Sequence, residues 1–422
     1  MRVWLRRLGE QLSTGFVAIP AACALAAVAL GLVLTELDQL FADDLPFIFG
    51  GGPAGARSLL SALVTSMVSL TGVVFSITIV VLQLASSQFS PRVLRSFLRS
   101  RSTQVTLGVF IATFLYAVIV LRAVRGDDGV DAFVPQLAVT GAFLLLLASA
   151  GMFIHYIRHI TQSIRVSTIV RRVGDEAREL IARTADDRRR FPVPSPPLTG
   201  EPSARVAATE PGVVVAIDVD TLVERAREAG NVLEMRIRLG DFAPEGAVVL
   251  DVHPASTAPR SGDGGAVAAL PALLRALPQA QERTMEQDIA FGFRQLADIA
   301  ERALSPGVND PTTAVQALDE IHDLLRRLVT EPDAPEAYTD EDGVVRLVLR
   351  QRAFGDYLDL GVDEILDYGQ GSSQVRRRMA AVLDDLLSVA RPEHRPAILA
   401  KQVRLVRLLG TGEEDREAQP AP

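Results

Sequence analysis

The sequence is poor in cysteine, lysine and histidine, and each shortage excludes a class of chemistry. Cys23 is the only cysteine, so neither an intrachain disulfide nor a cysteine-based metal site can form. Lys401 is the only lysine, and the five histidines are dispersed along the chain. No glycine-rich phosphate loop, histidine-rich metal motif or nucleophile elbow occurs. We therefore expect that the protein is not an enzyme and that it binds no metal and no cofactor.

Charged residues are also scarce, and those present are mainly acidic. They make up 22% of the 422 residues, against 48% hydrophobic residues, and the net charge is -8. Nucleic acid is excluded as the main partner, because binding to phosphates needs a cationic surface. A mean hydropathy of +0.23 is too high for a wholly soluble protein.

Four long stretches before residue 160 carry no charged side chain. They are residues 11–35, 58–91, 102–121 and 132–157. Because about 20 apolar residues cross a bilayer as a helix, a four-helix transmembrane domain is predicted over residues 1–160. Its spans are expected at about 14–35, 59–88, 103–122 and 133–157, with the lipid bilayer as partner. A cleaved signal peptide is the alternative for the first stretch, but Pro20 and the lack of a small-residue cleavage site before Glu36 favour a retained helix.

The orientation of the spans in the membrane follows from the arginines in the short segments that flank them, because arginine-rich flanks stay on the cytoplasmic side. One set of flanks holds eleven: Arg2, Arg6, Arg7, Arg92, Arg95, Arg99, Arg101, Arg158, Arg165, Arg171 and Arg172. The other set holds only three: Arg57, Arg122 and Arg125. A multi-pass protein of the cell inner (plasma) membrane is predicted, with both termini cytoplasmic.

The second span differs chemically from the others, because small and hydroxyl residues follow one face. Its pore-lining candidates are Thr65, Ser69, Gly72, Ser76 and Gln83. Such a face allows close helix packing, and it equally suits a water-lined conduit built from several copies of the helix. Hydroxyls facing lipid would be hard to satisfy, and Val74 and Val81 are expected to face lipid instead.

Pro91 is expected to bend the chain beyond this span. The arginines that follow are Arg92, Arg95, Arg99 and Arg101. They are predicted either to lie on lipid headgroups or to form the inner mouth of a pore. His155 and His159, one helical turn apart, are expected to bond water or headgroups rather than a metal.

The cytoplasmic half is predicted to be α+β. The fourth span is expected to continue as a helical stalk over residues 161–190, followed by a proline-rich linker over 191–210. A small β module is predicted at 211–253, a loose linker at 254–280, a helical domain at 281–410 and a disordered tail at 411–422. Within the helical domain, one helix is expected over residues 344–367.

Residues 239–246 of the β module, LGDFAPEG, resemble the turn of biotinyl and lipoyl half-barrels. No lysine stands in the module, so nothing can be attached there, and a structural or docking role is expected.

Residues 305–313 are predicted to form a tight corner between two helices. Gly307 would supply a positive φ, Asp310 would cap the second helix and Pro311 would fill its first turn. The alternative is a polar pocket. Its lining would be Arg294, Asp298, Asn309, Asp310 and Thr312.

Four motifs resemble bacterial membrane proteins of domain of unknown function family 2254. They are VLQLASSQFSPR at residues 81–92, RSTQ at 101–104, FGFRQL at 291–296 and RALSPGVNDP at 302–311. The resemblance implies an integral membrane protein with four N-terminal spans and a cytoplasmic C-terminal half, and it implies no particular activity.

Two classes of function are consistent with these patterns. One is a homo-oligomeric channel or transport pore for an ion or small solute, gated by its cytoplasmic domain. The other is a membrane-anchored sensor or scaffold whose cytoplasmic domain binds a partner. The second span distinguishes these two classes of function, because a scaffold does not need a long helix face made of small and polar residues.

Overall fold

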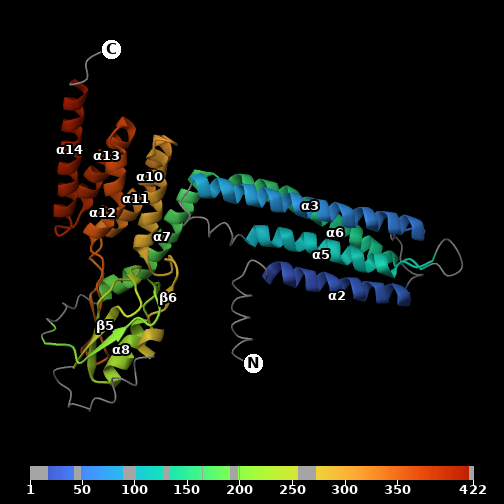
Figure 1. Ribbon diagram of the computed structural model, residues 1–422, viewed down its shortest axis with the longest axis horizontal. Helices are drawn as coiled ribbons and strands as arrows, with labels where there is room; N and C mark the ends of the chain where they lie inside the picture. Colours follow the sequence, from blue (N-terminus) through green and yellow to red (C-terminus); the bar gives the residue numbers. More distant parts are fainter. Residues whose placement is uncertain are drawn as a thin grey trace. The chain divides into compact units, whose positions relative to one another are not determined.

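The computed structural model describes residues 18–41, 49–88, 101–126, 133–163, 165–190, 198, 200–254 and 272–417. The chain divides into two compact units, residues 1–168 and 169–422 (Figure 1). Long apolar helices make up the first, and helices with small β-sheets make up the second. Four long apolar helices followed by an α+β region are therefore confirmed.

The first unit is built around one central helix. Its helices are α2 (Ala18–Phe41), α3 (Pro53–Gln88), α5 (Arg101–Ala123) and α6 (Gln136–Ser163). All four are long and apolar enough to cross a membrane. The most buried is α5, which packs against α2, α3 and α6 (Figure 1).

Small and hydroxyl residues join these helices. A side-chain carbon on Gly108 of α5 would stand 2.9 Å from the Cys23 sulfur of α2, so the close approach of the two helices requires glycine there. Between α5 and α6, the Thr113 and Ser149 hydroxyls are 2.9 Å apart and buried. Polar side chains inside the bundle thus find partners on neighbouring helices.

A buried carboxylate closes one end of this bundle. Asp38 of α2, only 2% exposed, accepts hydrogen bonds from the Leu137 and Ala138 N–H groups, at 2.8 and 2.9 Å. These N–H groups belong to the first turn of α6, where a helix has no backbone acceptors of its own and favours negative charge. Tyr116 of α5 donates its hydroxyl to the Ala138 carbonyl, 2.9 Å away. Three helices are thereby tied together at one point.

The next helix belongs to the second unit. Helix α7 (Val166–Arg190) covers most of the helical stalk predicted over residues 161–190, and α6 before it ends at Ser163. Ile169, Val173, Ala177 and Leu180 of α7 are buried. A side-chain carbon on Gly292 would stand 3.0 Å from the Ala177 methyl, so α7 packs closely on the helix that holds Gly292.

Two small sheets lie in the second unit. Their strands are β1 (Ala204–Ala207), β2 (Gly212–Val214), β3 (Asn231–Met235), β4 (Phe242–Ala243), β5 (Val248–Pro254), β6 (Gln279–Ala280), β7 (Ala337–Thr339) and β8 (Val345–Val348). The larger sheet has the order β1-β5-β3-β8-β7, and the smaller one β4-β2-β6. Only the β3–β8 pair is parallel, with Leu233 opposite Leu347. Helix α8 (Val219–Glu228) packs against β3 and β8.

The sheet reaches beyond the predicted β module of residues 211–253. Strands β1, β7 and β8 all lie outside that range, so a half-barrel built from the module alone is not what the structure shows. The helix predicted over residues 344–367 is wrong in its first part. Apolar residues alternate with Arg346 there, and Arg346 pairs with the buried Asp340 at 2.7 Å, which suits the strand β8.

The remaining helices form a bundle. They are α10 (Ile289–Leu304), α11 (Pro311–Val329), α12 (Phe354–Tyr368), α13 (Ser373–Val389) and α14 (Arg395–Glu417). Figure 1 shows them side by side, with α10 in contact with α11 and α12. Helix α14 continues to Glu417, into residues that were predicted to be a disordered tail.

Replacing Asp38 tests how far the first unit depends on the closed end of its bundle. We expect Asp38→Ala to cost about 1–3 kcal/mol, because two buried N–H groups lose a charged acceptor, and to lower the melting temperature of the detergent-purified protein. Asp38→Asn, which keeps one oxygen acceptor, should lie in between. The control is Glu36→Ala, since Glu36 is exposed on the same helix. Equal melting temperatures for the alanine variants would contradict this role.

Candidate functional site

Helix α3 has two opposite faces. Leu60, Leu63, Met67, Val74 and Val81 are buried in the bundle. The pore-lining candidates Thr65, Ser69, Gly72, Ser76 and Gln83 are all exposed. At about 3.6 residues per turn, each set lies within an arc of about 60°, and the arcs are centred about 180° apart. The small and hydroxyl face therefore points away from the other described helices of the first unit.

Two hydroxyl groups of this face, those of Thr65 and Ser69, are bonded within the helix. Thr65 donates to the Ser61 carbonyl at 3.0 Å, and Ser69 donates to the Thr65 carbonyl at 3.1 Å. Their protons thus need no partner outside the helix, contrary to the expectation that lipid would leave them unsatisfied. An open groove follows the face, lined by Ser58, Ser61, Ala62, Thr65, Ser66, Ser69, Leu70 and Val73.

The expected lipid-facing positions of α3 are wrong. Val74 is fully buried and Val81 is only 5% exposed, because both face α5 and α6. The large exposed residues are instead Val68, Phe75 and Ile79 on one side of the small face, and Val73 and Val80 on its other side. Lipid contact is therefore expected at these flanking positions.

The other membrane-side candidates are only partly described. Arg92, Arg95 and Arg99 lie outside the described residues, and Arg101 is the exposed first residue of α5. His155 stacks on His159 with ring centroids 6.3 Å apart, and its Nε2 lies 3.1 Å from the Ser102 hydroxyl. Among the residues that the structure describes, the groups able to hold a metal lie elsewhere.

Arg294 joins two helices of the second unit. Its guanidinium lies 2.5 Å from Asp298 and 3.5 Å from Glu301 on α10, and 2.5 Å from Glu364 on α12. Burial alone would lower the pKa of Arg294, but these carboxylates outweigh it and raise the pKa. The three carboxylates have ligand-like spacing, yet a guanidinium already fills the place among them.

The corner after α10 has a different geometry from the predicted one. Asn309, with φ of 48°, adopts the left-handed conformation, whereas Gly307 does not. Asp310 caps α11, accepting from the Thr313 N–H at 3.1 Å and the Thr313 hydroxyl at 2.6 Å. These bonds hold the pKa of Asp310 below its usual value.

The residues of the alternative polar pocket fall into two groups along the chain. Arg294 and Asp298 lie within α10, about 15 Å and about 9 Å before its end along the helix axis, whereas Asn309, Asp310 and Thr312 follow that end. A pocket shared by the two groups stays a prediction.

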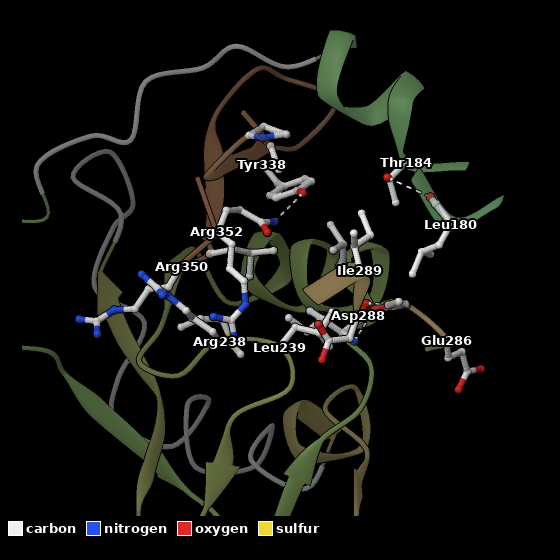
Figure 2. A pocket seen from close by; sticks show the side chains of 18 of the residues that line it. Leu180, Thr184, Arg238, Leu239, Glu286, Asp288, Ile289, Tyr338, Arg350 and Arg352 are labelled. Carbon is white, nitrogen blue, oxygen red and sulfur yellow. Dashed lines mark hydrogen bonds between the residues drawn. The ribbon is translucent and has the colours of Figure 1, made fainter. Parts of the chain in front are cut away.

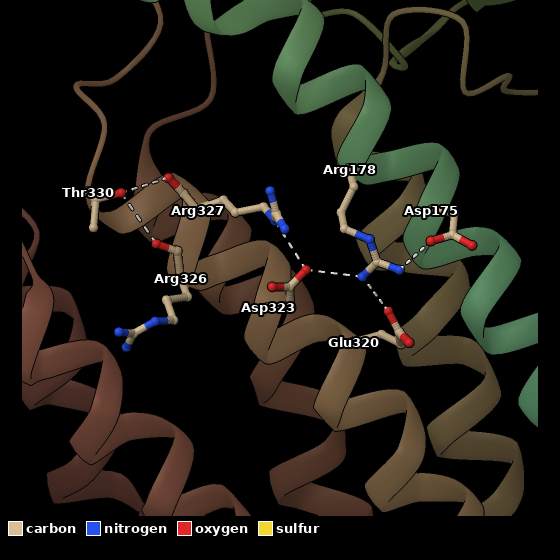
Figure 3. Close-up of polar contacts among 7 residues, drawn as sticks. All are labelled: Asp175, Arg178, Glu320, Asp323, Arg326, Arg327 and Thr330. Carbon is tan, nitrogen blue, oxygen red and sulfur yellow. Dashed lines mark hydrogen bonds and ion pairs between the residues drawn. The ribbon is translucent and has the colours of Figure 1, made fainter.

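A second arginine ties α7 to the bundle, as Figure 3 shows. Arg178 of α7 contacts Glu320 at 2.6 Å and Asp323 at 3.0 Å, both on α11, and also Asp175 at 2.6 Å. Asp323 in turn accepts from Arg327 at 3.1 Å. Burial would lower the pKa of Arg178, but the three carboxylates raise it. The helix that follows the last span is thus held to the second unit by charge as well as by apolar packing.

A cavity of about 500 Å³ lies beside α7, and sequence analysis did not find it. Its walls come from α7, the chain after β3, the start of α10 and the chain after β8 (Figure 2). Arg183, Arg238, Arg350 and Arg352 line it. The only sequence signal was the pair of arginines at 350 and 352, which follows a strand that had been predicted as a helix.

Two acidic side chains, Asp288 and Glu286, also line this cavity, and the buried Asp288 is already paired with Arg283. Asp288 accepts from Arg283 Nε at 2.9 Å and Nη2 at 2.6 Å, and from the Phe291 N–H at 3.3 Å as the cap of α10. Burial raises the pKa of Asp288, and Arg283 opposes that shift. Glu286, the other acid, is exposed. The charge of Arg352 also opposes the rise in the pKa of Asp288, so Asp288 interacts with one arginine of the cavity, whereas the Arg183 and Arg350 side chains have no acidic partner among the described residues.

These features define a class of proteins with four candidate membrane-spanning helices followed by an α+β unit. The chain belongs to the family described as "Predicted membrane protein (DUF2254)", whose model matches residues 13–385. The resemblance carried by the four sequence motifs is thereby confirmed.

Similar proteins occur in mycobacteria. The uncharacterized proteins Rv1290c of Mycobacterium tuberculosis and Mb1321c of Mycobacterium bovis are 33% identical over 371 residues, which is 85% of this chain and 69% of theirs. Neither their names nor the family description gives an activity. No solved structure matches the chain.

Substitutions at the corner test which residue carries its conformation. Asn309→Val should cost about 1–3 kcal/mol, because a β-branched residue is strained at positive φ, whereas Asn309→Gly should be tolerated. Gly307→Ala should also be tolerated, since a side-chain carbon there meets open space. Thermal unfolding of the purified variants measures these effects. Greater destabilisation by Gly307→Ala than by Asn309→Val would contradict the assignment.

Proposed function

We propose that the protein is a homo-oligomeric channel or transport pore in which the exposed face of α3 lines a conduit for an ion or small solute. The observation that carries this proposal is the position of that face. It lies opposite the side of α3 that packs in its own bundle, so copies of α3 can meet around a symmetry axis. The C-terminal unit is the proposed gating domain, on the cytoplasmic side.

The side chains around α3 support this arrangement. Val68, Phe75 and Ile79 on one side of the small face, and Val73 and Val80 on the other, are exposed and suit contact with lipid tails, whereas the face between them carries small and hydroxyl side chains. Small residues such as Gly72, where a side-chain carbon would meet open space, allow helices to approach closely. The face is therefore better suited to other copies of α3 than to lipid.

The hydroxyl bonds indicate what a conduit could carry. Because Thr65 and Ser69 donate their protons to carbonyls of their own helix, their oxygen lone pairs remain available on the exposed face. Such oxygens accept hydrogen bonds from water and attract cations. They favour water, a cation or a hydrogen-bond-donating solute over an anion.

A second candidate function is a membrane-anchored sensor or scaffold, and the arginine-lined cavity beside α7 favours it. The oligomeric state separates the two candidates, because a sensor does not need copies of α3 around an axis. Light scattering in detergent measures it. A monomer in both detergent and native membranes would overturn the conduit proposal and leave the sensor.

The orientation can be tested by cysteine labelling on a Cys23→Ser background. If both termini are cytoplasmic, Gly50→Cys, in the segment before α3, should react with an impermeant maleimide added to intact cells. Glu245→Cys, exposed in the second unit, should react only after lysis. Labelling of Glu245→Cys from outside would reverse the orientation.

Enlarging the small face tests the conduit. Ser69→Leu and Ser76→Leu should narrow and dry the path, so we expect the conductance of the purified protein in planar bilayers to fall by half or more. The matched control is Gly151→Leu, which enlarges an exposed small position on α6 where a side chain meets open space. Equal conductance for all three variants would contradict a path along α3.

A further inference from the structure

We propose that the cavity beside α7 binds an organic phosphate, with the phosphate held by Arg238, Arg350 and Arg352 and the organic part lying on the apolar wall. Figure 2 shows the three arginines gathered on one side of the cavity. This inference does not rest on the conduit, because it concerns a site within the second unit alone.

The first argument is the positive charge of the arginines that the carboxylates of the protein do not pair in full. Among the residues that the structure describes, Arg350 and Arg183 have no hydrogen-bond or ion-pair partner. Arg238 lies 3.7 Å from Asp356, and Arg352 donates one hydrogen bond to Asp241 at 3.3 Å, so these two arginines are paired in part, each through one of its five N–H donors. Guanidinium groups with free N–H donors bind phosphate oxygens in pairs, so several arginines facing one cavity are typical of a phosphate site.

The second argument is the apolar surface that also lines the cavity. Ile217, Ile237 and Leu239 are only partly buried there, so they offer apolar contacts to a ligand. Tyr338 lines the cavity as well, and its hydroxyl accepts a hydrogen bond from Gln351 at 3.4 Å. An inorganic ion would leave this wall without contact, and a neutral molecule would leave the arginines unpaired. A ligand with an anionic and a flat or apolar end satisfies both.

The third argument is size and position. A volume of about 500 Å³ lies within the range of small-molecule sites. Leu180 and Thr184 place one wall of the cavity on α7, which follows the last membrane span after two residues. A bound ligand therefore contacts the helix that joins the two units.

Calorimetry on the full-length protein in detergent tests the site with defined probes. We expect adenosine 5′-monophosphate or a short-chain soluble phosphatidic acid to bind at least about tenfold more tightly than inorganic phosphate and adenosine. Which of the two binds identifies the source as a nucleotide or a lipid headgroup. Affinity should fall with added salt, because guanidinium and phosphate charges are screened.

Variants assign the binding to the cavity. Arg350→Gln should weaken the bound probe about tenfold or more, through loss of a charged hydrogen bond. It should leave the melting temperature unchanged, because Arg350 is exposed. The control is Arg225→Gln, which removes an exposed arginine of α8 that is paired with Glu228 outside the cavity. Equal affinities in the two variants, no binding of either organic phosphate, or equally tight binding of inorganic phosphate would overturn the proposal.

Discussion

A polar group that leaves water costs free energy unless it finds a partner inside the protein, and this constraint shapes both units. In the first unit it fixes how α2, α5 and α6 meet, because the Asp38 carboxylate supplies acceptors to the N-terminus of α6. In the second unit the same constraint fixes which helices pack together, because Arg178 and Arg294 each contact carboxylates from two helices. Apolar packing brings the elements together, and these polar contacts determine their register.

Features that depend on local pattern could be predicted from the sequence, and features that depend on distant contacts could not. The length of the stretches without charged residues was sufficient to predict the four apolar helices. The sequence Asp310-Pro311 was sufficient to predict where α11 begins. Strand β8 was missed because four residues are too few to show a period against the helical pattern that follows them. The cavity beside α7 was missed because its arginines come from separate segments of the chain.

The near absence of lysine has a structural counterpart in these contacts. With Lys401 as the only lysine, nearly every basic side chain is a guanidinium, which has five N–H donors in one plane. Arg178 and Arg294 each use this plane to bridge three carboxylates. Arg183 and Arg350 line the cavity beside α7 with the same planar donors, and no carboxylate among the described residues pairs with them.

The parallel pairing of β3 with β8 has a consequence for how the chain is made. Strand β5 follows β3 closely and can pair with it early, but the other edge of β3 waits until residues 345–348 have left the ribosome. Helices α10 and α11 lie between the two strands and are synthesised first. Contacts of such sequence separation form slowly, so the open edge of β3 is exposed during synthesis, when an unpaired edge is prone to mispairing. Chains that stop before β8 would keep that edge open and be targets for chaperones or proteases.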